Sequence, residues 1–187
     1  MKKNLSISFK LTLVMIIVCA VIYPLLIAAV GKITPGGGKG ETEIVNGKMV
    51  GYSNIGQKFT DDKYFWSRPS AVDYNAAGSA GSNKGPSNPD YLKTVQDRID
   101  TFLAHNPGVK KEDIPADLVT ASGSGLDPDL SPNAAYIQIR RIAVIRQLPE
   151  EKIKALVDRQ IEKPLAGILG PSKVNVLRLN IALDALK

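Results

Sequence analysis

The sequence predicts one mixed α/β domain that a single N-terminal transmembrane helix anchors to a membrane. The first observation is an uncharged, apolar segment, Leu11–Val30. The second is that the rest of the 187-residue chain contains both hairpin and helix signals and is long enough to bury one hydrophobic core. The third is that no internal repeat is visible, so a single exported domain is expected after the anchor.

The apolar segment Leu11–Val30 consists mostly of leucine, isoleucine and valine. As a helix it spans about 30 Å, the thickness of the hydrocarbon core of a bilayer, and transmembrane helices tolerate a proline such as Pro24. The alternative is a cleaved signal peptide, whose apolar region is about 7–15 residues long and ends at small residues. Ile27, two residues before Ala29, suits such a cleavage site poorly. We therefore predict a retained anchor.

The distribution of charge predicts the orientation of this anchor. Lys2, Lys3 and Lys10 precede it without any acidic residue. The lysines that follow it are soon joined by Glu41 and Glu43. Because positive charge is retained on the cytoplasmic side, we expect a single-pass protein of the cell (plasma or inner) membrane with its N-terminus in the cytoplasm and its C-terminal domain outside. The exported part is then too weakly basic for a nucleic-acid footprint.

The chain therefore divides into four predicted parts. Pro35–Gly40 is rich in glycine, which favours a flexible joint between anchor and domain. The parts are a cytoplasmic N-terminus (1–10), a transmembrane helix (11–30), a Gly-rich linker (31–40) and an extracytoplasmic mixed α/β domain (41–187).

Turn and loop signals open the exported part. Asn46-Gly47 separates two short apolar runs, which predicts a β-hairpin over residues 43–50 because both turn positions require positive φ. Residues 75–89 are rich in glycine, serine, alanine and asparagine, and a loop of this length is usually functional or disordered. The role of this loop stays open.

Three helices are expected from their start signals. Asn88-Pro89 and Ser131-Pro132 each combine an N-cap residue with proline at the first helical position. Pro149 precedes two glutamates, which suit the positive end of a helix dipole. The expected helices cover residues 89–105, 132 to about 146, and 149 to about 161. Residues 174–186 fit both a strand and a helix, and we favour the helix.

Most catalytic chemistry is absent from the sequence. The single cysteine, Cys19, lies in the apolar segment, and the single histidine, His105, lies at a helix end, where capping or solvation is expected. This excludes cysteine-cluster and multi-histidine metal sites. The carboxylates of Asp61-Asp62, Asp127 and Asp129 are interpreted as turn or cap acids. No P-loop, dinucleotide fingerprint or nucleophile elbow is present, so no catalytic or metal-binding residue is predicted.

One loop has the composition of an anion site: Ser122, Gly123, Ser124 and Gly125. Its backbone N–H groups and hydroxyls lead toward a helix start, and such groups bind phosphates. A tight Gly-rich connection is the alternative explanation.

Polar residues on the helix that follows are further candidates. Gln138 lies between two isoleucines and is either exposed or a hydrogen-bonding group at a site. Arg140, Arg141 and Arg146 could pair with acidic partners, although a solvated helix face is the simpler interpretation.

Several stretches, in order along nearly the whole chain, resemble the KdpC family, whose members are the small single-span component of the Kdp potassium-transporting P-type ATPase. The stretches that carry this resemblance are Tyr23-Pro24-Leu25, Ile55-Gly56-Gln57-Lys58-Phe59, Tyr64-Phe65-Trp66-Ser67-Arg68-Pro69-Ser70-Ala71, Gly78-Ser79-Ala80-Gly81-Ser82-Asn83, Ser87-Asn88-Pro89, Leu118-Val119-Thr120-Ala121-Ser122-Gly123-Ser124-Gly125-Leu126-Asp127, Gln138-Ile139-Arg140-Arg141-Ile142-Ala143 and Val174-Asn175-Val176-Leu177-Arg178-Leu179-Asn180.

The resemblance implies a non-catalytic accessory subunit of a high-affinity, ATP-driven potassium uptake pump. The implied partners are a potassium-binding channel-like subunit, the P-type ATPase catalytic subunit, a small one-helix subunit and the lipid bilayer, without nucleic acid. The implied role is a catalytic chaperone that raises the ATP affinity of the pump subunit. No covalently bound cofactor is implied; ATP, shared with the pump subunit, would lie near Ser122, Gly123, Ser124, Gly125 and Gln138, a nucleotide or coupling region.

The residues agree with a non-catalytic role. The chain lacks the D-K-T-G-[TS] phosphorylation motif, and one span cannot enclose a conduction path. The predicted orientation places the Ser/Gly loop outside the cell, where ATP is scarce, so direct ATP contact stays open, as do the partner interfaces. The alternative function is an independent membrane-anchored envelope enzyme or binding domain that uses Asp61, Asp62 or Asp127.

Overall fold

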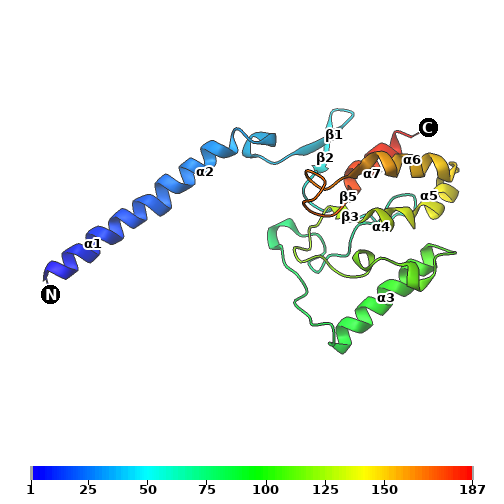
Figure 1. Ribbon diagram of the computed structural model, residues 1–187, viewed down its shortest axis with the longest axis horizontal. Coiled ribbons are helices and arrows are strands. Elements are labelled where there is room, and N and C mark those ends of the chain that lie inside the picture. The colour runs from blue at the N-terminus through cyan, green and yellow to red at the C-terminus, as the bar shows by residue number, and fades with distance from the viewer. Residues whose placement is uncertain (1, 187) are drawn as a thin grey trace. The chain divides into compact units, whose positions relative to one another are not determined.

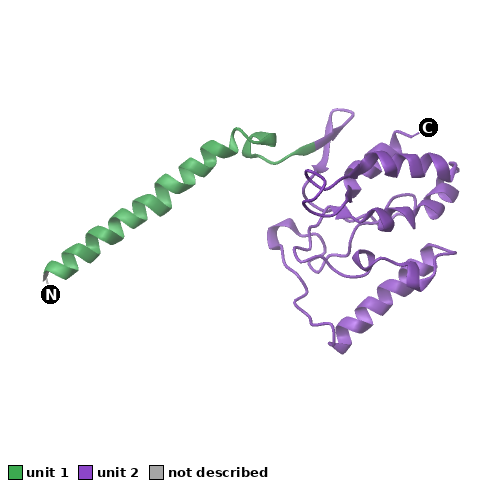
Figure 2. Ribbon diagram, in the orientation of Figure 1, with its two compact units in different colours: residues 1–42 green, residues 43–187 purple. Residues whose placement is uncertain are grey.

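The computed structural model describes residues 2–186 and divides into two compact units, residues 1–42 and 43–187 (Figure 2). The combination of helices, strands and one N-terminal helix that is apolar enough to span a membrane confirms the predicted fold class.

The first unit is dominated by one long helix, which runs from α1 (Lys2–Ile17) through a π-helical turn (Val18–Ile22) into α2 (Tyr23–Gly31). Its residues Lys3–Gly31 are long and apolar enough to cross a membrane, and none of that segment is buried. The helix begins well before the apolar segment predicted from sequence. Pro24 has no N–H to donate, and its ring clashes with the backbone carbonyl four residues earlier. The helix therefore widens into the π turn just before Pro24. A 3₁₀ turn (Pro35–Gly38) follows.

The second unit opens with the predicted hairpin. Strands β1 (Thr42–Val45, which begins at the last residue of the first unit) and β2 (Lys48–Tyr52) pair with each other. Asn46 has φ 51° and Gly47 has φ 76°, the positive values that a two-residue hairpin turn requires. The hairpin prediction is therefore confirmed.

A second, antiparallel sheet has the strand order β3-β5-β4; Figure 1 labels β3 and β5 of this sheet. Its strands are short: β3 (Asp129–Leu130), β4 (Ile161–Glu162) and β5 (Lys173–Asn175). Val174 of the central strand lies opposite Leu130 on one side and Ile161 on the other. The sheet thus joins segments that are far apart in the sequence.

Five α-helices complete this unit: α3 (Pro89–His105), α4 (Pro132–Tyr136), α5 (Ile139–Arg146), α6 (Glu150–Gln160) and α7 (Val176–Asp184). In the described part of this unit, one 3₁₀ turn (Ala76–Gly78) lies between the hairpin and α3, and two more (Lys111–Asp113 and Ala116–Leu118) lie between α3 and α4. The predicted N-caps are confirmed, because Asn88 accepts a hydrogen bond from the N–H of Tyr91 and Ser131 accepts one from Ala134.

The single helix predicted from residue 132 to about 146 is wrong, because the structure interrupts it between α4 and α5. The N–H of Gln138 bonds to Ala135, three residues back, instead of to Ala134. The side-chain Nε2 of Gln138 takes over the carbonyl of Ala134 at 3.0 Å. The side chain therefore replaces the backbone donor of its own residue and permits the change of direction.

The C-terminal segment contains both elements that its pattern suggested. Residues 173–175 form β5, and the favoured helix begins directly afterwards at Val176. Asn175 ends the strand and caps the helix, because its side chain accepts a hydrogen bond from the N–H of Arg178 at 3.1 Å.

The core lies where α5, α6 and α7 pack against one another and where α6 and α7 pack on β5. Its largest fully buried apolar side chains are Phe65, Leu130, Ile142, Ile153, Val157, Val174, Val176, Leu179 and Leu183. Helix α3 buries Phe102 and lies at the opposite edge of the unit from α6 and α7 (Figure 1). The segment that carries Phe65 therefore runs through the middle of the unit.

Candidate functional site

The central segment, residues 62–70, is held by side chains from several helices. Asn180 of α7 accepts a hydrogen bond from the N–H of Phe65 at 2.9 Å and donates to its carbonyl at 3.0 Å. Gln138 accepts from the N–H of Trp66 at 2.8 Å. Because this segment has no regular secondary structure, these side chains supply the partners that its buried backbone needs.

Arg141 is the centre of a buried polar network next to this segment. Its Nε donates to Asn106 at 2.9 Å, its Nη2 donates to Gln138 at 2.8 Å, and its Nη1 donates to the carbonyl of Asp62. The Asp62 carboxylate lies 3.7 Å from Nη1, and the guanidinium stands 4.8 Å from the centre of the Trp66 ring. Arg141 thus connects α3, α5 and the central segment.

Burial lowers the pKa of Arg141 to about 10, and the nearby carboxylates of Asp62 and Asp61 oppose this shift. The guanidinium therefore stays charged at neutral pH. The prediction of a solvated arginine face is wrong for Arg141, and it is also wrong for Arg146, which pairs with Asp184 at 2.7 Å. Arg140 is exposed, as predicted.

Gln138 is fully buried and uses all its hydrogen-bonding groups. Its oxygen accepts from Trp66 and Arg141, and its Nε2 donates to the carbonyls of Ala134 and Trp66. Of the two roles that its sequence position left open, the structure shows a buried hydrogen-bonding group. A ligand could reach Gln138 only by displacing these partners.

The Ser/Gly loop contacts the other end of the central segment. The N–H of Ser122 donates to the carbonyl of Pro69 at 3.2 Å, and Ser122 is buried. Next to the loop, Arg68 pairs with Asp127 at 3.0 Å. Gly123 and Ser124 are exposed, and the hydroxyl of Ser124 accepts from the N–H of Leu126. The loop and Gln138 therefore hold two ends of one segment.

We expect Gly125→Ala to destabilise the fold by about 2–4 kcal/mol, whereas Gly123→Ala should change the stability by less than about 0.5 kcal/mol. Gly125 has φ +68°, and a Cβ there would lie 2.6 Å from Val72 and 2.9 Å from the carbonyl of Ala80. A Cβ on Gly123 would meet nothing within 4 Å. Chemical unfolding of the full chain in detergent compares the two variants, and equal stability would contradict this assignment.

The carboxylates that could have formed a catalytic pair have structural partners. Asp61 accepts from the N–H of Lys63, which lowers the pKa of its carboxyl, and Asp127 accepts from the N–H of Asp129; both are turn acids, as predicted. Asp62 lies in the same turn, as predicted, but its carboxylate also has partners outside the turn; for Asp129 the prediction is wrong. Asp129 lies in β3 and pairs with a lysine of β5, whereas Asp62 pairs with an arginine and a histidine.

His105 lies in the last turn of α3, as expected, and has contacts that the sequence did not reveal. Its Nδ1 lies 2.9 Å from Asp62, and its ring centre lies 4.9 Å from that of Trp66. In the described part of the chain, no three histidine, cysteine, aspartate or glutamate side chains form a group that could hold a metal.

A groove of about 530 Å³ lies between α3 and the central segment. Trp66, His105, Arg98 and Tyr74 contribute to its lining. Burial raises the pKa of the Tyr74 hydroxyl to about 12, and this hydroxyl donates to the carbonyl of Arg68 at 2.6 Å. The buried Nε1 of Trp66 has no hydrogen-bond partner within the described residues, so it can still donate to an acceptor.

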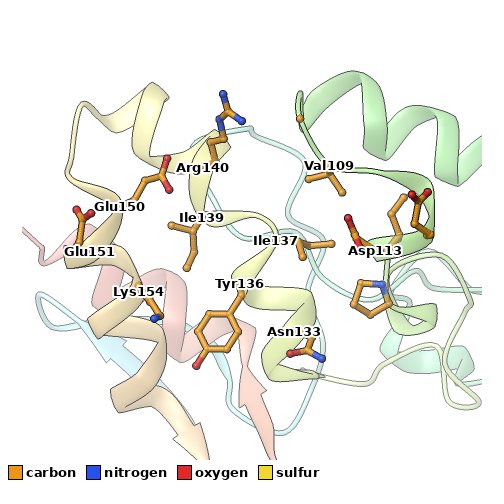
Figure 3. Close-up of a pocket in the computed structure, with 14 residues that line it drawn as sticks. Val109, Asp113, Asn133, Tyr136, Ile137, Ile139, Arg140, Glu150, Glu151 and Lys154 are labelled. Atoms are coloured by element: carbon orange, nitrogen blue, oxygen red, sulfur yellow. The ribbon is translucent and has the colours of Figure 1, made fainter.

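A larger groove of about 830 Å³ lies between α4, α5, the start of α6 and the turn at residues 111–113 (Figure 3). Figure 3 shows Tyr136 of α4, Ile139 of α5 and Ile137 between the two helices, with Glu150 of α6 on one side and Asp113 on the other. An apolar floor with charged edges is typical of a contact surface between proteins.

The polar network around Arg141 could not be recognised from single residues. One signal was present, because Gln138, Arg141 and Ile142 have the spacing of one helix face. Ile142 is apolar and lies on the same face, which favours an interior position for its two polar neighbours as well. Asn106, directly after the predicted helix 89–105, has a buried amide that donates to the carbonyl of Phe102.

Comparisons with known proteins agree on one family. The model of the family described as "KdpC: K+-transporting ATPase, c chain" matches residues 5–185. The chain is 60% identical over 185 residues to the potassium-transporting ATPase KdpC subunit of Flavobacterium psychrophilum, covering 99% of this chain and 100% of that protein. The corresponding subunit of Flavobacterium johnsoniae is 61% identical with the same coverage, and that of Caldanaerobacter subterraneus is 46% identical over 98% of this chain and 95% of that protein.

These matches extend from the anchor helix through α7, so they cover both units and the residues of the site. The family match includes almost the whole sequence. The sequence identity to the three relatives, 46% to 61%, is high enough to establish common family membership. The chain therefore belongs to the KdpC family, the c chain of the potassium-transporting ATPase.

Proposed function

We propose that the chain is a non-catalytic accessory subunit of a high-affinity, ATP-driven potassium uptake pump, in which it stabilises the complex and raises the ATP affinity of the pump subunit. The observation that carries this proposal is membership of the KdpC family over nearly the full length of the chain. The proposed partners are a potassium-binding channel-like subunit, the P-type ATPase catalytic subunit and a small one-helix subunit.

The structure supports an assembly role more than an independent reaction. Asp61, Asp62 and Asp127, the acids that an envelope enzyme would use, each have a partner inside the fold. The groove in Figure 3 offers an apolar surface with charges of both signs at its edges. These features suit a domain that contacts other subunits.

For the coupling to ATP, we propose an indirect role of the Ser/Gly loop and Gln138. Both hold the central segment, one at Pro69 and the other at Trp66. Gln138 is buried and its hydrogen-bonding groups are all paired. A change in the conformation of the central segment would therefore alter the ATP affinity of a partner subunit without contact between Gln138 and the nucleotide. ATP therefore stays a ligand of the complex in this proposal.

Purification of the full chain from a detergent-solubilised membrane fraction tests the proposed assembly. We expect the three partner subunits to be recovered with it and the chain alone to have no hydrolytic activity. Recovery without partners, together with hydrolytic activity of the isolated chain, would instead identify an independent envelope enzyme. Recovery without partners and without activity would also contradict the proposal.

We further propose that residues 1–10 are cytoplasmic, that 11–30 span the inner membrane, and that a linker (31–40) joins them to an extracytoplasmic domain (41–187). A reporter that is active only in the cytoplasm should be silent when it is fused to the C-terminus and active when it is fused to the N-terminus. The basic residues before the span are the physical reason. The reverse pattern of activity would contradict this orientation and would make direct ATP contact plausible again.

A further inference from the structure

The connection between β4 and β5 presents an exposed apolar tip, which we define as the β4–β5 loop (Pro164–Pro171). Leu165 is 74% exposed, Ile168 is 81% exposed and Leu169 is 61% exposed. No residue of the loop is charged, and Lys163 precedes it. Aliphatic side chains this exposed at adjoining positions of one loop are costly in water, so their exposure needs an explanation.

The tip is a closed turn in which the backbone is largely paired with itself. Leu165 and Leu169 exchange two backbone hydrogen bonds, each of 3.0 Å, and the N–H of Gly167 donates to the carbonyl of Pro164 at 2.9 Å. Unpaired backbone groups are what normally keeps a loop out of an apolar medium. Several backbone groups of this loop already have hydrogen-bond partners within the loop. Moving the loop from water into the membrane interface therefore costs less free energy.

An ion-pair bridge places the root of the β4–β5 loop at the point where the chain enters the second unit. Arg178 of α7 lies 2.7 Å from Glu43, the first residue of this unit, and 3.5 Å from Glu162, the last residue of β4. The entry point and the root of the β4–β5 loop thus belong to one end of the unit.

The length of the linker limits how far this end can move from the membrane. Residues 32–41 connect the helix that ends at Gly31 to β1, and ten extended residues span at most about 35 Å. We propose that the β4–β5 loop inserts Leu165, Ile168 and Leu169 into the boundary between the headgroups and acyl chains of the bilayer that holds the anchor. The proposal needs only the membrane anchor and does not depend on the proposed pump function.

The chemistry of the tip favours lipid over a protein partner. Protein contacts of high affinity are centred on tryptophan, tyrosine or arginine, and the loop contains none of these. Its side chains carry no group for directional recognition. Lys163 is exposed before the loop, where it can approach anionic headgroups.

The test places a fluorophore on the tip of the full chain. In a Cys19→Ala background, which removes the only native thiol, Ile168→Cys is labelled with an environment-sensitive NBD group. The protein is reconstituted into vesicles of phosphatidylethanolamine and phosphatidylglycerol that carry a nitroxide on the upper acyl chain. We expect blue-shifted emission and several-fold quenching, whereas a label at the exposed position of Ala104→Cys in α3 should stay unquenched.

Two further arms exclude an effect of the label and of a protein partner. Adding Leu165→Asp and Leu169→Asp to the labelled chain should abolish the quenching, because charged side chains do not enter the acyl region of a bilayer. Both leucines are exposed, so their replacement leaves the core intact. Equal quenching at positions 168 and 104, or none at 168, would overturn the proposal. Shielding at 168 that appears only with co-reconstituted subunits and without nitroxide quenching would also overturn it, and would identify a protein surface as the occupant.

Discussion

Replacing Arg141 by alanine is expected to lower the free energy of unfolding by about 3–5 kcal/mol. The change removes a buried guanidinium and with it the donor to the amide oxygen of Asn106 and to the carbonyl of Asp62. The amide oxygen of Gln138 loses one of its two donors and keeps the N–H of Trp66. Buried acceptors that lose a charged donor pay their full desolvation cost. For a chain of this length the loss corresponds to a decrease in Tm of about 6–20 °C, measured by far-UV circular dichroism in detergent.

Arg140→Ala is the matched control for this prediction. It removes the same side chain one residue earlier on the same helix, but Arg140 is exposed and lies at the edge of the groove in Figure 3. We expect its effect to be within about 0.5 kcal/mol. If the two variants unfold at the same denaturant concentration, the network around Arg141 does not stabilise the fold in the way that its geometry indicates.

Gln138→Ala is expected to reduce potassium-stimulated ATP hydrolysis by the assembled complex and to raise its apparent ATP constant by roughly 5- to 150-fold, a coupling of about 1–3 kcal/mol. The substitution frees both the N–H and the carbonyl of Trp66 and removes one partner of Arg141. Trp66 then loses both of its hydrogen bonds to Gln138, whereas Arg141 still bonds to the carbonyl of Asp62 at the start of the central segment. Complex yield and the ATP constant must be measured on the same preparations, because the variant also weakens the fold.

The conservative variant Gln138→Glu separates coupling from folding. It keeps the oxygen that accepts from Trp66 and Arg141 but loses the donor to Ala134, so we expect a higher yield and a smaller change of the ATP constant than for alanine. Gly123→Ala, on the exposed part of the Ser/Gly loop, should behave as the parent. A low yield of Gln138→Ala with a normal ATP constant in the surviving complex would assign Gln138 a structural role alone.

Local sequence patterns predicted the elements whose cause lies within a few neighbouring residues. Asn46 and Gly47 adopt the positive φ values of a hairpin turn, and Asn88 and Ser131 cap the helices that were expected to follow them. In these cases the partners are three residues apart or fewer. The apolar helix of the first unit follows from composition in the same way, although its start at Lys2 lies outside the apolar run.

Local sequence patterns gave wrong predictions where a side chain has a hydrogen-bond partner that is far away in the sequence. A continuous helix from residue 132 satisfies every local rule, and the break arises because Gln138 bonds both to Ala134 and to Trp66, 72 residues away. The candidate site was incomplete for the same reason. Residue type alone points to Gln138 and the Ser/Gly loop, but it predicts a solvated position for Arg141 and gives no role to Asn106, which bonds to Arg141 across 35 residues.

The sequence by itself determined the N-terminal helix that is apolar enough to span a membrane, the mixed α/β class, the hairpin and the absence of known catalytic motifs, because each depends on composition or on contacts between near neighbours. Only the tertiary structure decided that Arg141 is buried, that Gln138 is saturated by hydrogen bonds, and that the root of the β4–β5 loop shares Arg178 with Glu43 at the chain entry. The physical reason is that burial and ion pairing depend on which distant segments meet, and a polar side chain has the same appearance in the sequence whether its partner is water or a backbone group 72 residues away.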